Sequence, residues 1–593
     1  MVKIFKYLKL REWLMAGFSL VFIVAQVWLD LKLPDYMTEI TKLTQTPGSA
    51  MSDIWLNGGY MLLCALGSLA AAFAVGYFAA QIAARFSQRL RSLIFNKVES
   101  FSMEEINLFS TSSLVTRSTN DITQIQMLVV MGLQVAIRAP IMAVWAITKI
   151  SGKGFEWSMV TGVGVLIILT MVTLLMIFVV PRFRKMQILT DNITRVTREN
   201  LTGLRVVRAY NAENYQEDKF ETANEALTST QMFTSRAMAI MMPVMTVLIS
   251  GLSLAIYWIG AYLIDAAGLT ITAAGVPEKL EVFSNMVVFS QYAMQVIMSF
   301  MMLVMIFIML PRASVSAKRI NEVLDTEPQI IDGKETAGKS GVVGEVEFKS
   351  VSFKYPDAAE PVLENISFTA SSGETIAFIG STGSGKSTLI NLVPRFFDVT
   401  EGEVLVDGVN VRDYELEALL NKIGYVPQKA VLFKGTVTSN VAYGDNGSDS
   451  FSSDDVEKAV RIAQGADFVE KMEDGYDAPV SQGGTNISGG QKQRLAIARA
   501  VCRKPEIYIF DDSFSALDYK TDRILRSELK KETAGVTTLI VAQRIGTIMD
   551  ADQIIVLDEG RIVGKGTHKE LLRDCAVYKE IAMSQLSEEE LAS

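Results

Sequence analysis

The chain has 593 residues, of which 49% are hydrophobic and 20% charged, and its mean hydropathy is +0.27. This composition excludes a disordered chain and is apolar enough to predict membrane-spanning segments. Three cysteines are too few for a disulfide framework or a cysteine-based zinc site. A single histidine, His568, also argues against His-rich metal chemistry and against a Ser-His-Asp triad.

The formal net charge of −9 is divided unequally along the chain. Residues 1–330 carry 27 Lys+Arg against 23 Asp+Glu, a net of +4, whereas residues 331–593 carry 29 against 42, a net of −13. The long apolar runs also lie almost entirely in the first part. The sequence therefore predicts a membrane domain over 1–330 and an acidic, water-exposed domain over 331–593. The acidic second domain argues against nucleic acid as a partner.

Six apolar runs in the first part predict an α-helical domain with six membrane spans. Each run reaches about 20 residues or more, which is long enough to cross ~30 Å of hydrocarbon as a helix. The connections after the second and fourth runs are long and helical in pattern, and the other three are short. The predicted spans are Trp13–Leu33, Trp55–Ala84, Leu128–Ile150, Trp157–Val180, Met238–Ile264 and Phe283–Leu310.

The placement of Lys and Arg predicts how these spans are oriented. The connection after the fourth span, Pro181–Met238, carries nine Lys and Arg, residues 1–11 carry four, and each short connection carries one lysine. By the positive-inside rule, both termini, the long connections and the second domain face the cytoplasm of a multi-pass protein in the cytoplasmic (inner) membrane. A cleavable signal peptide over residues 1–30 is the alternative, but the first run continues without a small-residue cleavage site.

Two features inside the spans are candidates for a substrate pathway. Arg138 lies in the third span, and an intramembrane charge commonly faces a wet cavity or a partner. Alternatively, this span extends into the cytoplasm and Arg138 lies at the interface. The sixth span is rich in methionine, including Met298 and Met302. Flexible thioethers suit a surface that accepts many apolar shapes, although helix packing also explains methionines here.

From Gly344 onward, short strands alternate with amphipathic helices, which is typical of an α/β domain. A buried strand, Glu374–Ile379, leads directly into a glycine-rich segment that matches the phosphate-loop pattern. In such a loop, backbone N–H groups curl around phosphates, the lysine reaches the β- and γ-oxygens, and the following serine can ligate Mg²⁺. The predicted nucleotide-binding residues here are Gly380, Ser381, Thr382, Gly383, Ser384, Gly385, Lys386, Ser387 and Thr388.

A second buried strand, Ile507–Phe510, ends in Asp511. A carboxylate at the end of a buried parallel strand is placed to hold Mg²⁺ beside the phosphates of a nucleotide. Such a strand is common by itself. Paired with the phosphate loop, it predicts a nucleoside triphosphatase.

Between these two motifs lies the segment Asn486-Ile-Ser-Gly-Gly-Gln491, followed by a helix rich in Arg and Ala. Here the sequence resembles the ATP-binding cassette (ABC) transporters, and this segment looks like their signature motif. The resemblance covers almost the whole chain, because six spans followed by one P-loop cassette are similar to an ABC exporter half-transporter of the type IV fold. It implies an ATPase that uses ATP and Mg²⁺ and is coupled to transport.

Further positions match the family in order. Tyr355 matches the aromatic residue that stacks on adenine, Gln428 the glutamine that senses Mg²⁺, and Asp518 the end of the D-loop. The metal-binding set implied by the resemblance is therefore Ser387, Gln428 and Asp511.

The resemblance also concerns contacts with a partner. It implies coupling helices in the long connections, near Glu105–Ser112 and Tyr210–Asp218. In this family two cassettes also close head to tail. The resemblance further implies that the signature acts on ATP held by the partner's cassette, through Ser488, Gly489, Gly490 and Gln491.

Two positions depart from the family pattern. Asp512 stands where the family usually has a glutamate that polarises the attacking water. Its side chain is one methylene shorter, and a misplacement of roughly 1 Å can cost on the order of 10²-fold in rate. Gln543 stands where the family has a histidine beside the γ-phosphate, and a glutamine cannot carry the positive charge of a histidine.

These departures resemble the degenerate-site subunit of heterodimeric bacterial multidrug-type ABC exporters. The resemblance then implies a second half-transporter that supplies the glutamate and histidine of the competent site. The expected substrate is an amphipathic drug-like or lipid-like small molecule taken from membrane lipid. The alternatives are a regulatory or gating ABC protein that binds ATP without pumping, and a homodimeric peptide or lipid exporter.

Overall fold

The computed structural model describes residues 2–46, 48–151, 154–266, 278–356, 358–444, 446–447 and 451–586. The chain forms two compact units. The first, helical unit comprises Met1–Glu99 and Ser112–Thr326, and the second comprises Ser100–Thr111 and Glu327–Ser593. The second unit therefore contains a short segment that precedes most of the first unit in sequence.

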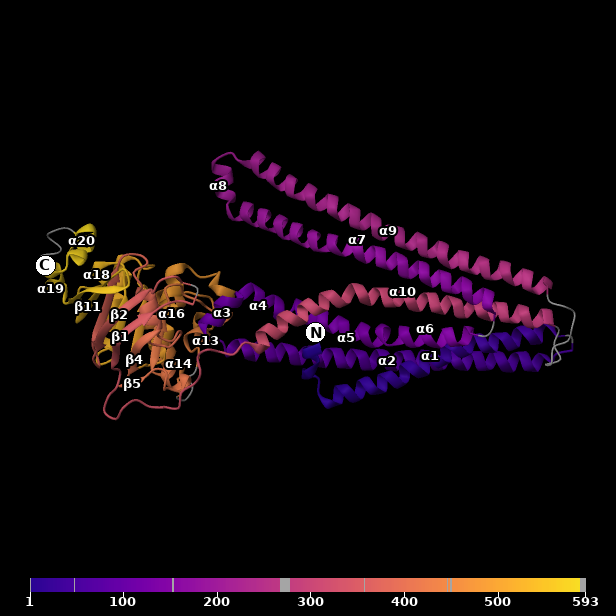
Figure 1. Cartoon of the computed structure of the whole chain (residues 1–593). Coiled ribbons are helices and arrows are strands. Elements are labelled where there is room, and N and C mark those ends of the chain that lie inside the picture. The colour runs from indigo at the N-terminus through magenta and orange to yellow at the C-terminus, as the bar shows by residue number, and fades with distance from the viewer. Residues whose placement is uncertain are drawn as a thin grey trace. The chain divides into compact units, whose positions relative to one another are not determined.

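The first unit consists of long helices joined by short helical segments (Figure 1). Among the described residues, six stretches are long and apolar enough to cross a membrane, which confirms the predicted six spans: Leu10–Gln45, Met51–Glu99, Thr111–Ile150, Phe155–Thr202, Glu213–Ala266 and Glu278–Leu303. The elements are η1 (Val2–Tyr7), α1 (Leu10–Gln45), α2 (Met51–Glu99), α4 (Thr111–Ser118), α5 (Asn120–Met131), η2 (Gly132–Ala136), α6 (Arg138–Ile150), α7 (Phe155–Thr202), α8 (Leu204–Ala209), α9 (Glu213–Ala266) and α10 (Glu278–Asp325).

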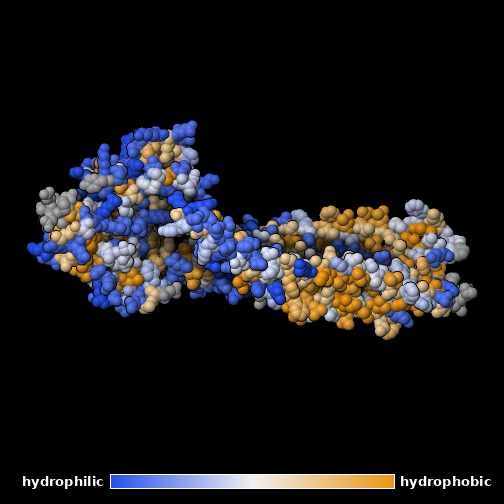
Figure 2. All heavy atoms as spheres, turned by 90° about the horizontal axis from the view of Figure 1, so that it is seen from above, coloured by the Kyte–Doolittle hydropathy of each residue, from blue (hydrophilic) through white to orange (hydrophobic). Residues whose placement is uncertain are grey.

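Apolar side chains cover the outer surface of these helices. Figure 2 shows hydrophobic residues gathered along the helical unit, and large side chains such as Leu63, Phe73 and Ile167 are exposed there. The backbone polar groups are meanwhile bonded within the helices, as a hydrocarbon environment requires. The inner faces pack in pairs: α1 lies along α2, α7 along α9, and α10 along α5 and α6.

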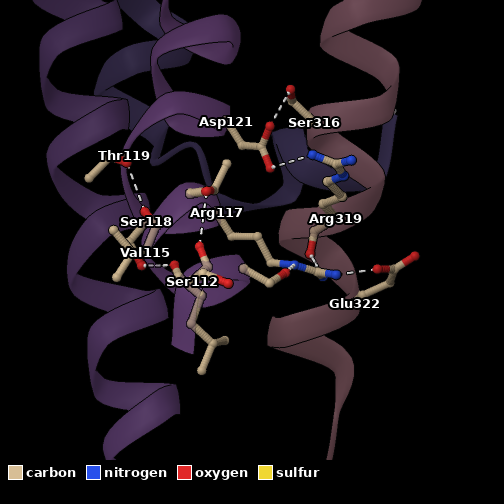
Figure 3. Close-up of polar contacts among 12 residues, drawn as sticks. Ser112, Val115, Arg117, Ser118, Thr119, Asp121, Ser316, Arg319 and Glu322 are labelled. Carbon is tan, nitrogen blue, oxygen red and sulfur yellow. Dashed lines mark hydrogen bonds and ion pairs between the residues drawn. The ribbon is translucent and has the colours of Figure 1, made fainter. Parts of the chain in front are cut away.

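A polar cluster holds the start of the third span to the end of α10 (Figure 3). Arg117 donates to the Arg319 carbonyl over 2.7 Å and pairs with Glu322 over 2.9 Å. One helical turn further on, the buried Asp121 accepts a hydrogen bond of 2.7 Å from Ser316 and lies 4.0 Å from the Arg319 guanidinium. These contacts join α4 and α5 to α10 at two levels.

The second unit is built from two main sheets flanked by helices (Figure 1). Its strands are β1 (Val346–Phe353), β2 (Leu363–Ala370), β3 (Thr375–Gly380), β4 (Glu401–Val406), β5 (Val409–Asn410), β6 (Ile423–Val426), β7 (Gly435–Thr436), β8 (Pro479–Val480), β9 (Ile507–Asp511), β10 (Thr537–Val541), β11 (Gln553–Asp558) and β12 (Arg561–Gly566). Its helices are α3 (Met103–Phe109), α11 (Lys386–Asn391), α12 (Leu416–Asn421), α13 (Val437–Val441), α14 (Ser453–Ile462), α15 (Ala466–Val469), η3 (Gly475–Asp477), η4 (Gln482–Gly484), α16 (Gly489–Cys502), α17 (Tyr519–Glu532), α18 (Ile545–Ile548), α19 (His568–Asp574) and α20 (Ala576–Gln585).

In the described chain, the larger sheet has six strands in the order β12-β11-β3-β10-β9-β6, and all neighbours pair in parallel except β12 with β11. An antiparallel sheet, β2-β1-β4-β5, packs against it through a core that includes Phe348, Phe368 and Phe378. This architecture confirms the predicted α/β P-loop cassette. It also places the carboxyl ends of β3, β10, β9 and β6 at one edge.

The helix α3 belongs to this second unit although it lies between spans two and three in sequence. Ser102 caps it, and the Glu105 carboxylate accepts hydrogen bonds from the Ser102 backbone N–H at 2.7 Å and from the Gln329 N–H at 3.1 Å. Glu105 is only 3% exposed. Its buried carboxylate therefore connects α3 to the segment that leads into the cassette strands.

His568, the single histidine, packs inside this unit. It is 8% exposed, and its Nδ1 lies 2.6 Å from the hydroxyl of the buried Tyr578. Its contacts are those of a packing residue.

Candidate functional site

The candidate site lies at the carboxyl edge of the parallel strands. The phosphate loop follows β3, Asp512 follows β9, Gln543 comes two residues after β10, and Gln428 comes two residues after β6. Because β3, β10, β9 and β6 are consecutive neighbours, residues from four separate stretches of sequence meet there. The structure thus brings the predicted phosphate-loop, metal and catalytic positions together.

The phosphate loop depends on glycine at a close approach of two backbone segments. A Cβ atom on Gly380 (φ 155°) would lie 2.0 Å from the Leu557 carbonyl oxygen, which no side chain could accommodate. The loop then turns through Gly383 (φ 88°) and Gly385 (φ 92°), both in the left-handed region. Ser381, Thr382 and Gly383 are exposed, so the apex of the loop is open to a ligand.

Lys386 lies folded against this loop. Its Nζ donates to the carbonyls of Gly380 at 2.9 Å and Ser381 at 2.7 Å and to the Ser384 hydroxyl at 3.2 Å. Burial lowers the pKa of the Lys386 ammonium from its ordinary value. A cation surrounded by neutral acceptors in this way is well placed to exchange them for phosphate oxygens.

Two of the three predicted metal ligands, Ser387 and Asp511, are in contact, whereas Gln428 bonds to the neighbouring Asp512. The Ser387 hydroxyl donates to Asp511 Oδ1 over 2.8 Å, and Asp511 is 5% exposed. Burial raises the pKa of the Asp511 carboxyl. These hard oxygen donors fit Mg²⁺, which usually takes one or two carboxylates together with substrate phosphates. When bound, the ion supplies positive charge at the phosphate oxygens.

Tyr355 borders the loop on the side of the antiparallel sheet. Its hydroxyl lies 3.1 Å from the Thr388 hydroxyl. Its ring makes T-shaped contacts with the rings of Phe353 and Phe397, at centroid distances of 4.8 and 5.3 Å. These contacts hold the half-buried ring in place. An aromatic face fixed in this manner can stack on a nucleotide base.

The two positions that depart from the family pattern touch each other. Gln543 Nε2 donates to Asp512 Oδ2 over 2.9 Å, and Gln428 Nε2 donates to the same oxygen over 3.3 Å. Asp512 is 7% exposed, and burial raises the pKa of its carboxyl. One carboxylate oxygen thus accepts hydrogen bonds from two amides.

The signature segment is exposed at the start of α16. Ser488 caps the helix, with its hydroxyl accepting from the Gln491 N–H at 3.4 Å and its own N–H donating to Gln491 Oε1 at 3.0 Å. Ser488 and Gly489 are exposed, and Gly490 is half-buried. Asp518 caps α17 by accepting a hydrogen bond from the Thr521 N–H at 3.0 Å, and it too is exposed. Both segments are therefore accessible to another molecule.

Comparison with known proteins identifies two family matches, the ABC transporter domain over residues 363–515 and the ABC transporter transmembrane region over residues 16–276. An uncharacterized ABC transporter ATP-binding protein of Mycobacterium tuberculosis is 42% identical over 531 residues, covering 89% of this chain and 87% of that protein. The chain belongs to the ABC transporter family.

Other relatives of this ABC transporter carry further information. An ATP-dependent lipid A-core flippase of Pseudomonas aeruginosa is 32% identical over 530 residues, covering 87% of this chain and 83% of the flippase. The solved structure of a bacterial Atm1-family ABC exporter with ATP bound has the same fold, with a TM-score of 0.78 at 24% identity over 98% of this chain and 100% of that one. The ABC transporter is therefore a multi-pass membrane ATPase with the fold of an exporter half-transporter, and its predicted use of ATP and Mg²⁺ is confirmed.

In the helical unit of the ABC transporter, Arg138 has a partner. It pairs with Asp30 over 2.8 Å, and the Ser68 hydroxyl donates to the other Asp30 oxygen over 2.5 Å. The π-helical turn η2 ends at Ala136, two residues before Arg138. Sequence reasoning missed Asp30, although an acidic residue inside the first apolar run was the signal that could have found it.

The two methionines predicted for the substrate pathway lie one helical turn apart on α10. Met298 is 46% exposed and Met302 is 39% exposed. They form part of the accessible apolar surface of the helical unit. Their contact with substrate, like that of Arg138, stays a prediction.

Proposed function

We propose that this ABC transporter is one of two unlike subunits of an exporter for amphipathic, lipid-like molecules, and that its own ATP site hydrolyses slowly. The contact between Asp512 and Gln543 carries this proposal. Both side chains differ from the glutamate and histidine that the family usually places there. An intact phosphate loop beside two altered positions supports a site that retains ATP.

The chemistry of Asp512 supports slow hydrolysis. A carboxylate that activates water must reach the water and accept its proton. Asp512 is one methylene shorter than glutamate, and its Oδ2 already accepts hydrogen bonds from Gln428 and Gln543. Gln543 also lacks the positive charge that a histidine can bring to the γ-phosphate. Each difference disfavours the reaction without removing a group that binds ATP.

The exposed signature supports a role in the partner's site. Ser488 and the glycines that follow it offer a hydroxyl and backbone N–H groups at the start of α16, a helix of 14 residues. Such a helix start favours anions. In the proposed pair, this signature completes the competent site, and the partner subunit supplies the glutamate and the histidine.

Two observations support a lipid-like substrate exported across the cytoplasmic membrane. The flippase of Pseudomonas aeruginosa, a relative over most of both chains, is named for a lipid substrate. Met298 and Met302 also present flexible apolar surface on α10. The basic residues of the long connections support a cytoplasmic location for the cassette and both termini.

The first test compares the purified chain with the complete transporter. The chain alone, in lipid nanodiscs, should bind ATP yet turn it over about 10²-fold more slowly than the same chain assembled with its partner half-transporter. Steady-state phosphate release measures the turnover. Robust turnover by the isolated chain, unaffected by Asp512→Ala, would contradict the proposal.

A second test restores the family residues. Asp512→Glu combined with Gln543→His should raise hydrolysis at this chain's site by about 10²-fold, because the carboxylate regains its reach and the γ-phosphate gains a histidine. Single-turnover hydrolysis of labelled ATP bound to this chain measures the gain. The matched control is Asp474→Glu, which adds the same methylene at an exposed position before η3 and should leave hydrolysis unchanged. No gain in the double variant would show that other features limit hydrolysis.

A homodimeric lipid exporter is the second candidate function. The flippase similarity favours it, because the shared stretch covers both the membrane and the cassette regions. It requires that Asp512 and Gln543 support turnover in both sites. Fast turnover by the chain alone that is abolished by Asp512→Asn would establish it.

A further inference from the structure

The C-terminal helix α20 packs beneath the loop that carries Gln543. Its Tyr578 and Ala582 are fully buried and share a core with Ile545 and Ile548 of α18. This packing fixes the position of the last residue of the helix, Gln585, whose side chain is exposed. The end of α20 is thus held next to the loop between β10 and α18.

The Gln585 amide makes two hydrogen bonds to the backbone of this loop. Its Nε2 donates to the Gln543 carbonyl over 2.8 Å, and its Oε1 accepts from the Ile545 N–H over 2.9 Å. These are the carbonyl and the N–H on either side of Arg544, the pair that a neighbouring parallel strand would bond. Gln585 therefore bonds the backbone of this loop on both sides of Arg544.

The other side of the same loop faces the ATP site. Gln543 donates to Asp512 over 2.9 Å, and the Arg544 guanidinium donates to the Ser515 carbonyl over 3.3 Å. The Ser515 hydroxyl in turn donates to the Asp512 carbonyl over 2.9 Å. Residues 543–545 are consequently held between the C-terminal helix and the segment that carries Asp512.

We propose that Gln585 is a positioning residue of the ATP site. By holding the backbone on both sides of Arg544, it keeps the Gln543 amide directed at Asp512, at the position where the family has a histidine beside the γ-phosphate of bound ATP. The inference rests on the proposed slowly hydrolysing site, in which ATP stays bound, and goes beyond it by giving Gln543 and the C-terminal helix a part in retaining the nucleotide.

The test measures how fast ATP leaves this chain's site. The assembled transporter in lipid nanodiscs is loaded with radiolabelled 8-azido-ATP, chased with unlabelled ATP, and photo-crosslinked at intervals, so that the label on this chain reports the remaining nucleotide. Gln585→Ala should speed release roughly three- to tenfold, the effect of losing one or two net hydrogen bonds. Gln585→Glu, of equal size, should also speed release, because its carboxylate faces the Gln543 carbonyl.

The matched control is Ser584→Ala, on the neighbouring residue, whose hydroxyl donates to Ile581 within its own helix. It should release ATP at the wild-type rate. Equal rates for Gln585→Ala and Ser584→Ala, while Gln543→Ala alone speeds release, would overturn the inference.

A double variant separates positioning from general loosening. If Gln585 acts through Gln543, adding Gln585→Ala to Gln543→Ala should change release by less than twofold. Multiplying effects would show that Gln585 acts independently and would overturn the inference. If Gln543→Ala alone leaves release unchanged, Gln543 does not retain the nucleotide and the inference is overturned, whereas the proposal of slow hydrolysis is tested separately by the turnover measurements.

Discussion

Replacing Lys386 with alanine should lower the affinity of this chain's own site for ATP by about 100-fold, which corresponds to ~2.7 kcal/mol. The Lys386 ammonium is folded into the phosphate loop against the carbonyls of Gly380 and Ser381. Hydrogen bonds from the lysine cation to phosphate are the strongest polar contacts of the loop, and alanine removes them while the backbone N–H donors remain. Photolabelling of the full-length chain with 8-azido-ATP over a range of concentrations measures the affinity.

The matched control for this prediction is Lys349→Ala. Lys349 is an exposed lysine of the same unit, on β1, and it pairs with Glu347 over 3.1 Å. Removing it should leave ATP affinity unchanged. An affinity of Lys386→Ala within about threefold of wild type would contradict the assignment of this loop as the phosphate site.

Replacing Asp30 with leucine should destabilise the helical unit by about 3–5 kcal/mol. Asp30 is the carboxylate that pairs with Arg138 over 2.8 Å inside the apolar spans. Leucine fills a similar volume but leaves the guanidinium without its counter-charge in a region of low dielectric. Unfolding of the purified chain in mixed detergent micelles, followed by tryptophan fluorescence, measures the loss.

Removing both charges should restore most of this stability. The double variant Asp30→Leu with Arg138→Met replaces an ion pair by apolar side chains, an exchange that is often neutral or stabilising. As a control, Glu199→Ala breaks an exposed ion pair with Lys219 and should cost at most about 1 kcal/mol. A double variant as unstable as Asp30→Leu would show that Asp30 matters for reasons other than Arg138.

The parts of the ATP site that could be predicted from sequence are the residues that directly follow a recognisable buried strand. A buried strand followed by glycines and Lys386 can turn in few ways, and Asp511 at the end of another apolar strand must lie at the same edge if the sheet is parallel. Topology therefore converts short motifs into a single site. The six spans could also be predicted from sequence, because the length of an apolar run shows whether a helix can cross a membrane.

Contacts between remote segments could not be predicted in this way. Arg138 was visible as an intramembrane charge, but its pairing with Asp30, 108 residues earlier, depends on how α1 and α6 are rotated about their axes. The bonds from Gln585 to the Gln543 loop depend likewise on where Tyr578 anchors α20. The periodicity of apolar residues shows which face of a helix is buried, but it does not show which other segment packs against that face.

The place of α3 in the second unit has a consequence for biosynthesis. The segment Ser100–Thr111 leaves the ribosome more than 200 residues before Gln329. The backbone N–H of Gln329 donates a hydrogen bond to the Glu105 carboxylate. Until that later residue is made, Glu105 lacks one of its partners. The cassette surface is therefore completed only after every membrane helix has been synthesised, which makes its final assembly step a late event in translation. A fragment that begins at residue 327 would lack this piece of its own unit.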